Sequence, residues 1–249
     1  MYQKIIQELN KLKNPAQAKN LQRFFKTGKG EYGGGDIFLG LKSQEIKDIA
    51  KKYYRETNFN DIKKLLNSEI HEHRVASLRI LVIQYEEGGD KIRKKIFDFY
   101  LKNTKNINNW DLVDMSAPNI VGQFLFQTCF SGGLSEKETS TKVSKNLVLY
   151  KLAKSKNLWE RRIAVLATFA FIREKDFRDA IKILEILLKD KHDLIHKAVG
   201  WMLREMGKRD KKELIKFLDK HALHMPRTML RYSIEKLPEK KRKYYLNKK

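Results

Sequence analysis

Apolar residues recur at the spacing of an α-helix along almost the whole chain, and this pattern restricts the fold more than any single motif. The first stripe runs from Ile5 to Leu12, and a second helix starts at Pro15. Only 13 Gly and 4 Pro interrupt the 249 residues, so we expect an all-α protein. Further helices are expected near 43–55, 59–68, 71–86, 89–103, 108–130 with a break near Pro118, 139–154, 158–173, 176–189, 191–207, 210–219 and 226–235.

Three segments resemble one another, as expected for a helical repeat. Residues 72–78 (Glu-His-Arg-Val-Ala-Ser-Leu) are similar to residues 160–166 (Glu-Arg-Arg-Ile-Ala-Val-Leu), and their separation, 160 − 72 = 88, equals two units of about 44 residues. A looser copy at 195–199 follows after 195 − 160 = 35 residues. We therefore predict a HEAT-like helical-repeat solenoid, an α-α superhelix in which the second helix of each pair lines a concave basic surface.

We expect this solenoid to form one domain over residues 1–249. A basic tail at about 238–249 carries two aromatic residues, Tyr244 and Tyr245. We expect the tail to be a frayed, solvated terminus. It could also fold over the last repeat or bind a nucleic acid.

The chain carries 53 Lys and Arg against 30 Asp and Glu, a formal net charge of +23. Nucleic acid is the commonest partner of such a basic domain, because Lys and Arg neutralise phosphates and release counterions. A generally lysine-rich sequence is the alternative, since lysine is spread along the whole chain. With 41% hydrophobic and 33% charged residues, the composition favours a folded protein over a disordered one.

Cys129 is the only cysteine, so no internal disulfide is possible and a reducing compartment is expected. Its neighbours favour a small buried side chain over a nucleophile. The N-terminal residues do not resemble a secretory signal, and no apolar run is long enough to span a bilayer. We expect a cytoplasmic protein that is a monomer and makes no membrane contact.

The longest glycine-rich stretch, residues 28–36, is predicted to be a flexible loop between helices. Glycines and lysines together could hold a phosphate, but the spacing does not match a Walker A motif and no strand precedes it. Lys26 and Lys29 could still contact a DNA backbone.

Trp110 and Asp114 are four residues apart, so they share one face of a helix and place an aromatic plane beside a carboxylate. Asp111 points about 100° away from that face, and we assign it to helix capping or scaffolding. Two later segments repeat the tryptophan and add an arginine, with Arg162 and Trp201 as the candidates. The tryptophans could instead fill the core, and Arg162 could be an ordinary surface residue.

Taken in order, these segments resemble the DNA alkylation repair enzymes of the AlkD type. The resemblance covers roughly Ile5 to Leu237 and rests on the set and order of its motifs rather than on any one of them. The motifs are Phe38-Leu39-Gly40-Leu41, Trp110-Asp111-Leu112-Val113-Asp114, the Trp159 to Arg162 pair, and Lys197-Ala198-Val199-Gly200-Trp201-Met202-Leu203-Arg204-Glu205.

The resemblance implies a solenoid that wraps duplex DNA and hydrolyses the N-glycosidic bond of N3- and N7-alkylated purines. It implies that the damaged base is not flipped into a deep pocket. On that pattern Asp114 is the catalytic carboxylate, Arg162 is its neighbour, and Trp110 and Trp201 are aromatic walls. Arg204 is expected to face the DNA backbone, and further DNA contacts are expected from Lys197, Trp159 and Arg161, with Lys26 and Lys29.

This chemistry is reasonable on physical grounds as well. An N3- or N7-alkylpurine is already cationic, so it leaves without a general acid, and positive charge moves to the sugar as the bond breaks. An ionised carboxylate stabilises that charge more in the transition state than in the ground state, and it can orient a water molecule. Aromatic faces also attract cationic groups. No cofactor is needed.

Two other classes of function compete with the enzyme. A non-catalytic HEAT-repeat protein that binds damaged or branched DNA would share the fold and the charge, but a carboxylate facing phosphate would weaken its binding. A protein-binding scaffold would have an apolar or mixed-charge concave surface. His192 and His196 are four apart and could ligate a metal, but no third ligand is evident, and we expect no metal site.

Overall fold

The computed structural model describes residues 1–130 and 147–248; the side chains of Cys129 and Phe130 lie outside the described part, as do residues 139–146 of one predicted helix. The prediction for the Cys129 side chain is therefore not addressed. The chain forms two compact units, Met1–Ser116 and Ala117–Lys249. The single domain over 1–249 stays a prediction.

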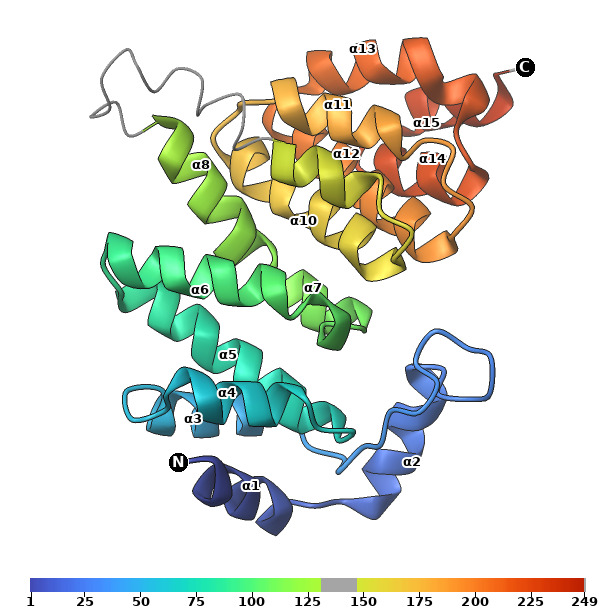
Figure 1. Ribbon diagram of the computed structural model, residues 1–249. Coiled ribbons are helices and arrows are strands. Elements are labelled where there is room, and N and C mark those ends of the chain that lie inside the picture. Colours follow the sequence, from blue (N-terminus) through green and yellow to red (C-terminus); the bar gives the residue numbers. More distant parts are fainter. Residues whose placement is uncertain (131–146, 249) are drawn as a thin grey trace. The chain divides into compact units, whose positions relative to one another are not determined.

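Unit 1 is built around one long buried helix, α5, which packs against α3, α4, α6 and α7. Both faces of α5 are covered, and its first turn is buried although it is made of polar residues. The elements of unit 1 are α1 (Tyr2–Lys11), α2 (Pro15–Phe24), α3 (Ser43–Tyr53), α4 (Phe59–Leu66), α5 (His71–Glu87), α6 (Asp90–Lys102), the short 3₁₀ turn η1 (Thr104–Asn106) and α7 (Trp110–Ser116) (Figure 1).

In unit 2, helices α10, α12 and α14 pack side by side (Figure 1). Gly200 allows the close approach of α12 and α14, because a Cβ at this position would lie 2.6 Å from the Met229 carbonyl oxygen. The elements are the π-helical turn η2 (Pro118–Gly122), α8 (Gln123–Phe130), a helix over 147–153, α10 (Leu158–Arg173), α11 (Arg178–Ile186), α12 (Asp193–Arg209), α13 (Lys211–His221), the 3₁₀ turn η4 (Ala222–His224), α14 (Arg227–Ile234) and α15 (Glu239–Asn247).

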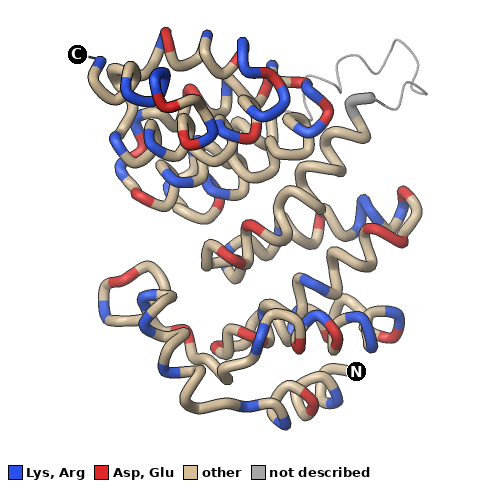
Figure 2. Tube along the Cα trace, turned by 180° about the vertical axis from the view of Figure 1, so that it is seen from behind, with Lys and Arg blue, Asp and Glu red and all other residues tan. Residues whose placement is uncertain are grey.

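The all-α prediction is confirmed, and the break near Pro118 is present as the π-helical turn between α7 and α8. Within residues 1–130 and 147–248 the only β pairing is a single bridge between Ile37 and Ile70. Among the described residues, no helix is long and apolar enough to cross a membrane. Lys and Arg are distributed over both units with Asp and Glu between them (Figure 2).

The expectation of a frayed basic tail is wrong. Residues 239–247 form helix α15, and Tyr245 is buried against the preceding helices. Its hydroxyl donates to the Asp219 carboxylate at 2.8 Å, and the Arg227 guanidinium donates to the Leu246 carbonyl at 2.7 Å. The many charged residues of the tail favoured a solvated terminus in the sequence analysis. The single buried ring of Tyr245 is enough to fix this short helix.

The helical repeat is visible in how three helices begin. Just before each of α5, α10 and α12 lies a polar residue that makes the same two hydrogen bonds. Its side-chain oxygen accepts from the backbone N–H two residues later, and its backbone carbonyl bonds a side-chain nitrogen six residues later. The residue pairs are Ser68 with Arg74, Ser155 with Arg161, and Asp190 with His196. The first residues of these pairs are separated by 155 − 68 = 87 and 190 − 155 = 35 residues, so the helical repeat is confirmed. The first separation is one residue shorter than the 88 residues found by comparing the sequences, and the second is the same.

The segment Phe38 to Leu41 is held by Glu72, a buried residue of the first turn of α5. The carboxylate accepts the backbone N–H groups of Leu39 at 2.9 Å, Gly40 at 2.8 Å and Leu41 at 3.3 Å. Gly40 has φ +90°, and a Cβ there would lie 2.1 Å from the Asn14 carbonyl oxygen. Glycine is therefore required at this point, and the segment is tied to the start of α2.

Candidate functional site

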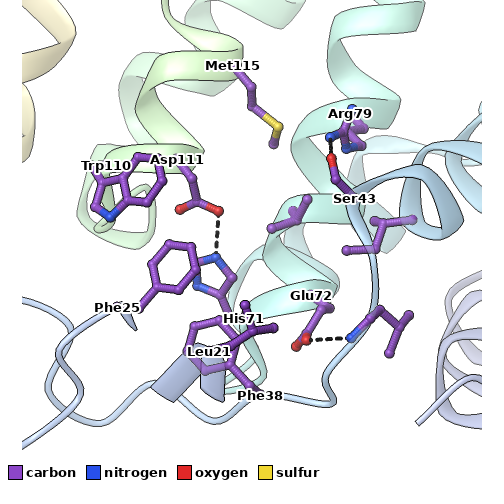
Figure 3. Close-up of a pocket in the computed structure, with 13 residues that line it drawn as sticks. Leu21, Phe25, Phe38, Ser43, His71, Glu72, Arg79, Trp110, Asp111 and Met115 are labelled. Carbon is purple, nitrogen blue, oxygen red and sulfur yellow. Dashed lines mark hydrogen bonds and ion pairs between the residues drawn. The ribbon is translucent and has the colours of Figure 1, made fainter. Parts of the chain in front are cut away.

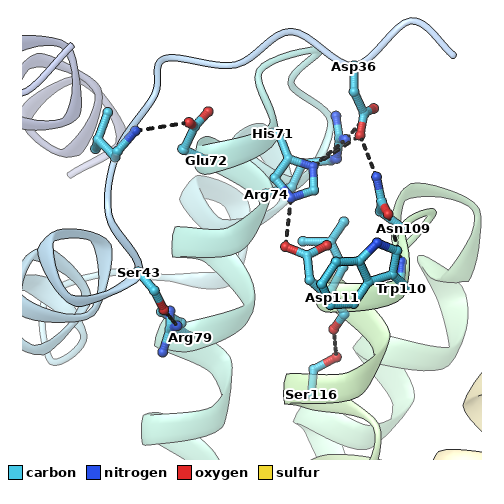
Figure 4. A network of polar contacts seen from close by, with 12 residues as sticks. Asp36, Ser43, His71, Glu72, Arg74, Arg79, Asn109, Trp110, Asp111 and Ser116 are labelled. Carbon is cyan, nitrogen blue, oxygen red and sulfur yellow. Dashed lines mark hydrogen bonds and ion pairs between the residues drawn. The ribbon is translucent and has the colours of Figure 1, made fainter. Parts of the chain in front are cut away.

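The candidate site of unit 1 is built around the start of α7, which Asn109 fixes from both sides. Its side-chain oxygen accepts the Trp110 backbone N–H at 2.8 Å, and its amide nitrogen donates to Asp36 at 3.0 Å. Asn109 is fully buried, so both bonds are shielded from water. The first turn of α7 is thus attached to the end of the glycine-rich loop (Figure 4).

His71 lies between two carboxylates, one from that loop and one from α7 (Figure 4). Its Nδ1 is 3.0 Å from Asp36 Oδ2, and its Nε2 is 2.8 Å from Asp111 Oδ2. Burial alone lowers the pKa of the imidazole, but the bonds to Asp111 and Asp36 outweigh burial and raise the pKa of His71 to about 9. The ring is therefore an imidazolium at neutral pH that donates to both carboxylates.

Arg74 completes the network by donating to Asp36 Oδ1 at 2.5 Å and to the Ser68 carbonyl at 2.8 Å. Burial raises the pKa of Asp36, but hydrogen bonds and the charge of Arg74 reverse the direction and lower it below its ordinary value. Two cations, His71 and Arg74, thus face two anions, Asp36 and Asp111. Buried charges are stable when they are paired in this way.

An aromatic stack lies beside this network. The Phe25 ring stacks on both Phe38 and Trp110, with distances of 5.1 and 5.0 Å between ring centroids. Phe38 in turn stacks on the His71 ring, with 4.6 Å between centroids. Phe24 contacts Trp110 edge to face at 5.8 Å and is 64% exposed. Trp110 itself is partly exposed, so this end of α7 presents aromatic surface to solvent.

A pocket of about 290 Å³ opens next to the stack. Asp111 Oδ1 and Arg79 Nε are buried there, and neither has a hydrogen-bond partner among the residues that the structure describes. The lining comes from α2, the 38–46 segment, α5 and α7, and includes Phe25, Phe38, His71, Arg79, Trp110, Asp111 and Met115 (Figure 3).

The two carboxylates of α7 have different surroundings. Asp111 lines the pocket and bonds His71; the scaffold role expected for it stays a prediction. Asp114 does not line the pocket; it is partly exposed, one turn after Trp110. Burial raises the pKa of Tyr100, and the charge of Asp114 adds to this rise, so Asp114 lies near that phenol.

The predicted residues of unit 2 lie on two helices that pack together, α10 and α12. Arg162 is only 4% exposed and donates from Nη1 to the Leu194 carbonyl at 2.5 Å, which ties α10 to the start of α12. Trp201 is partly exposed and lies 6.5 Å from the Phe169 ring. The guanidinium groups of Arg173 and Arg209 lie 5.1 and 5.3 Å from the Phe169 ring.

The residues expected to contact DNA have varied surroundings. Arg204 forms an ion pair with Glu235, Lys197 with Asp193 and Arg161 with Asp190. Trp159 is 8% exposed, as suits a side chain that packs in the core. Lys26 and Lys29 are exposed on and before the glycine-rich loop. Contact of these six residues with DNA stays a prediction.

Trp110 and Asp114 belong to unit 1, whereas Arg162 and Trp201 belong to unit 2. Sequence reasoning missed Asp36, His71 and Asn109, which are separated by 35 and 38 residues and share no local motif. Among the described residues, no three His, Cys, Asp or Glu side chains are arranged to hold a metal ion.

The fold and the charge define a basic, all-helical repeat protein. The chain belongs to the DNA alkylation repair enzyme family, whose model matches residues 5–237. A predicted DNA alkylation repair enzyme from Enterococcus faecalis has a similar structure, with a TM-score of 0.67 and 14% identity over 91% of this chain and 97% of that chain. AlkD2 from Streptococcus mutans is also similar in structure, with a TM-score of 0.51 and 18% identity over 89% of this chain and 97% of that chain. No curated protein matches the sequence significantly.

Proposed function

We propose that this protein is a DNA glycosylase that hydrolyses the N-glycosidic bond of cationic N3- and N7-alkylpurines in duplex DNA. The observation that supports it most is the pairing of Trp110 and Asp114, one turn apart and partly exposed on a helix whose start is fixed by buried hydrogen bonds. A carboxylate one turn from an aromatic side chain, on a helix whose start is fixed, is suited to a reaction in which positive charge moves from base to sugar.

In the proposed reaction the bond between C1′ of the deoxyribose and the purine nitrogen breaks, and its electron pair leaves with the base. The base departs neutral, so no proton is needed on it. Ionised Asp114 stabilises the oxocarbenium-like sugar and accepts a proton from the water that attacks C1′. The ring of Trp110 packs on the sugar and adds cation–π attraction of about 0.5–2 kcal/mol.

Unit 2 is proposed to act on the same duplex. Arg162 is held in one orientation by the Leu194 carbonyl, and Trp201 offers a second partly exposed indole. We propose that Arg204, Lys197, Arg161, Trp159, Lys26 and Lys29 contribute contacts to the DNA. The net charge of +23 supports backbone binding that weakens steeply with salt.

The protein is further proposed to work in the cytoplasm as a monomer, without cofactor or metal and without deep base flipping. The assay is the release of 7-methylguanine and 3-methyladenine from alkylated duplex DNA in the presence of a chelator. Wild-type protein should release base at least a hundredfold faster than Asp114→Asn. That variant should bind DNA equally well or more tightly, because one negative charge is removed.

Two results would contradict the proposal. Equal turnover by Asp114→Asn and wild type would remove Asp114 from the reaction. Tight, salt-sensitive DNA binding without any base release by the wild type would instead indicate a non-catalytic protein that binds damaged or branched DNA.

A further inference from the structure

We propose that His71 is a positioning residue: by bridging Asp36 and Asp111 it holds α7 so that Trp110 and Asp114 keep one orientation. This inference rests on the proposed glycosylase function for its kinetic part only. Its structural part concerns unit 1 alone.

The first turn of α7 needs such an anchor because the first backbone N–H groups of a helix have no partner within the helix. α7 covers seven residues and leads through Ala117 into the π-helical turn η2. Its end is fixed by Ser116, whose hydroxyl lies 2.8 Å from the Tyr100 phenol oxygen. Its beginning is fixed by Asn109 and by the bond between Asp111 and His71. The latter bond joins α7 directly to α5.

The anchor is ionic. The charged groups around the imidazole are Asp36 from the loop, Asp111 from α7, and Glu72, Arg74 and Arg79 from α5 itself (Figure 4). Glu72 is already occupied by three backbone N–H groups, and Arg74 bonds Asp36. Asp111 Oδ1 has no hydrogen-bond partner in the described part of the chain, so the His71 bond is the hydrogen bond that holds this carboxylate.

Loss of the His71 proton would break one of its two bonds, because a neutral imidazole donates from one nitrogen only. Asp111 would then face a lone pair or lose its charged partner, and the first turn of α7 would be released. Asp114 lies one turn further along the same helix. A shift of about 1 Å at a reacting group costs up to about a hundredfold in rate.

The experiment compares wild type with His71→Gln and Asp111→Asn in single-turnover base release at saturating protein, from pH 7 to pH 10, with spontaneous release subtracted. The matched control is His73→Gln. His73 is also buried in the first turn of α5, but it bonds the Ser68 hydroxyl instead of a carboxylate, and burial and the charge of Arg74 lower its pKa to about 4.

We expect the wild-type rate to fall on the alkaline side with a midpoint near pH 9, where His71 loses its proton. His71→Gln should be slower by about 10- to 100-fold and independent of pH over this range, with DNA affinity within about threefold of wild type. His73→Gln should keep the wild-type pH profile. A His71→Gln profile identical to that of the wild type, or an equal loss in His73→Gln, would overturn the proposal.

A second readout does not depend on activity. ¹⁵N NMR of the histidine side chains should show both nitrogens of His71 protonated at pH 7.5, and the indole signal of Trp110 should shift in Asp111→Asn. A neutral His71 at pH 7.5, or an unchanged Trp110 signal, would refute the anchor. If the wild type releases no base, these NMR results still decide the structural part.

Discussion

The His71 network predicts that unit 1 loses stability as the solution becomes alkaline. The pKa of His71 is raised from 6.5 to about 9 in the folded protein, so the folded state binds the proton more tightly than the unfolded state. The stabilisation is complete below pH 6.5 and is lost as pH rises through 9. A difference of 9 − 6.5 = 2.5 pKa units corresponds to about 3 kcal/mol of unfolding free energy.

The assay is urea unfolding of wild type and His71→Gln at pH 6 and pH 9.5, followed by circular dichroism and tryptophan fluorescence. Two compact units can give two transitions, so the effect is sought in the transition that belongs to unit 1. His73 does not disturb this comparison, because burial lowers its pKa to about 4, below the range of the assay. Burial also lowers the pKa of His192, which is present in both proteins.

Between pH 6 and pH 9.5 we expect the free energy of unfolding of the wild type to fall by about 3 kcal/mol more than that of His71→Gln. Subtracting the variant removes the contribution of every group that titrates alike in both proteins. If wild type and variant show the same pH dependence, His71 is not held as an imidazolium between Asp36 and Asp111, and the reasoning fails.

Two further predictions concern packing. Gly40→Ala should destabilise unit 1 by about 2 kcal/mol or more, because alanine is strained at φ +90° and its Cβ would meet the Asn14 carbonyl. Thermal unfolding measures this loss, and an unchanged midpoint temperature would contradict the prediction. Tyr245→Phe should cost about 1–2 kcal/mol by removing the hydrogen bond to Asp219 and should increase amide hydrogen exchange in α15; unaltered exchange would show that the tail is not anchored there.

Helical periodicity predicted most of the helices, because most of them bury a stripe of apolar residues and the spacing of that stripe is local. It also placed Trp110 and Asp114 on one helix. Periodicity failed for α15, where five of nine residues are charged and one buried ring, Tyr245, fixes the helix.

The polar network could not be predicted in the same way. Asp36 ends a glycine-rich loop, His71 begins a helix and Asn109 precedes another, and only the packing of these segments brings their side chains within 3.0 Å. Asp111 is an example. Helix geometry assigned it to capping or scaffolding, which stays a prediction, and nothing in the sequence identified His71 as its partner.

The most direct test of the account is the single-turnover release of 7-methylguanine from alkylated duplex DNA by Asp114→Asn and Asp111→Asn, measured beside the wild type. We expect Asp114→Asn to lose almost all activity at every pH, whereas Asp111→Asn keeps a reduced activity that no longer falls near pH 9. Release of 7-methylguanine by Asp114→Asn at the wild-type rate would contradict the proposed role of Asp114.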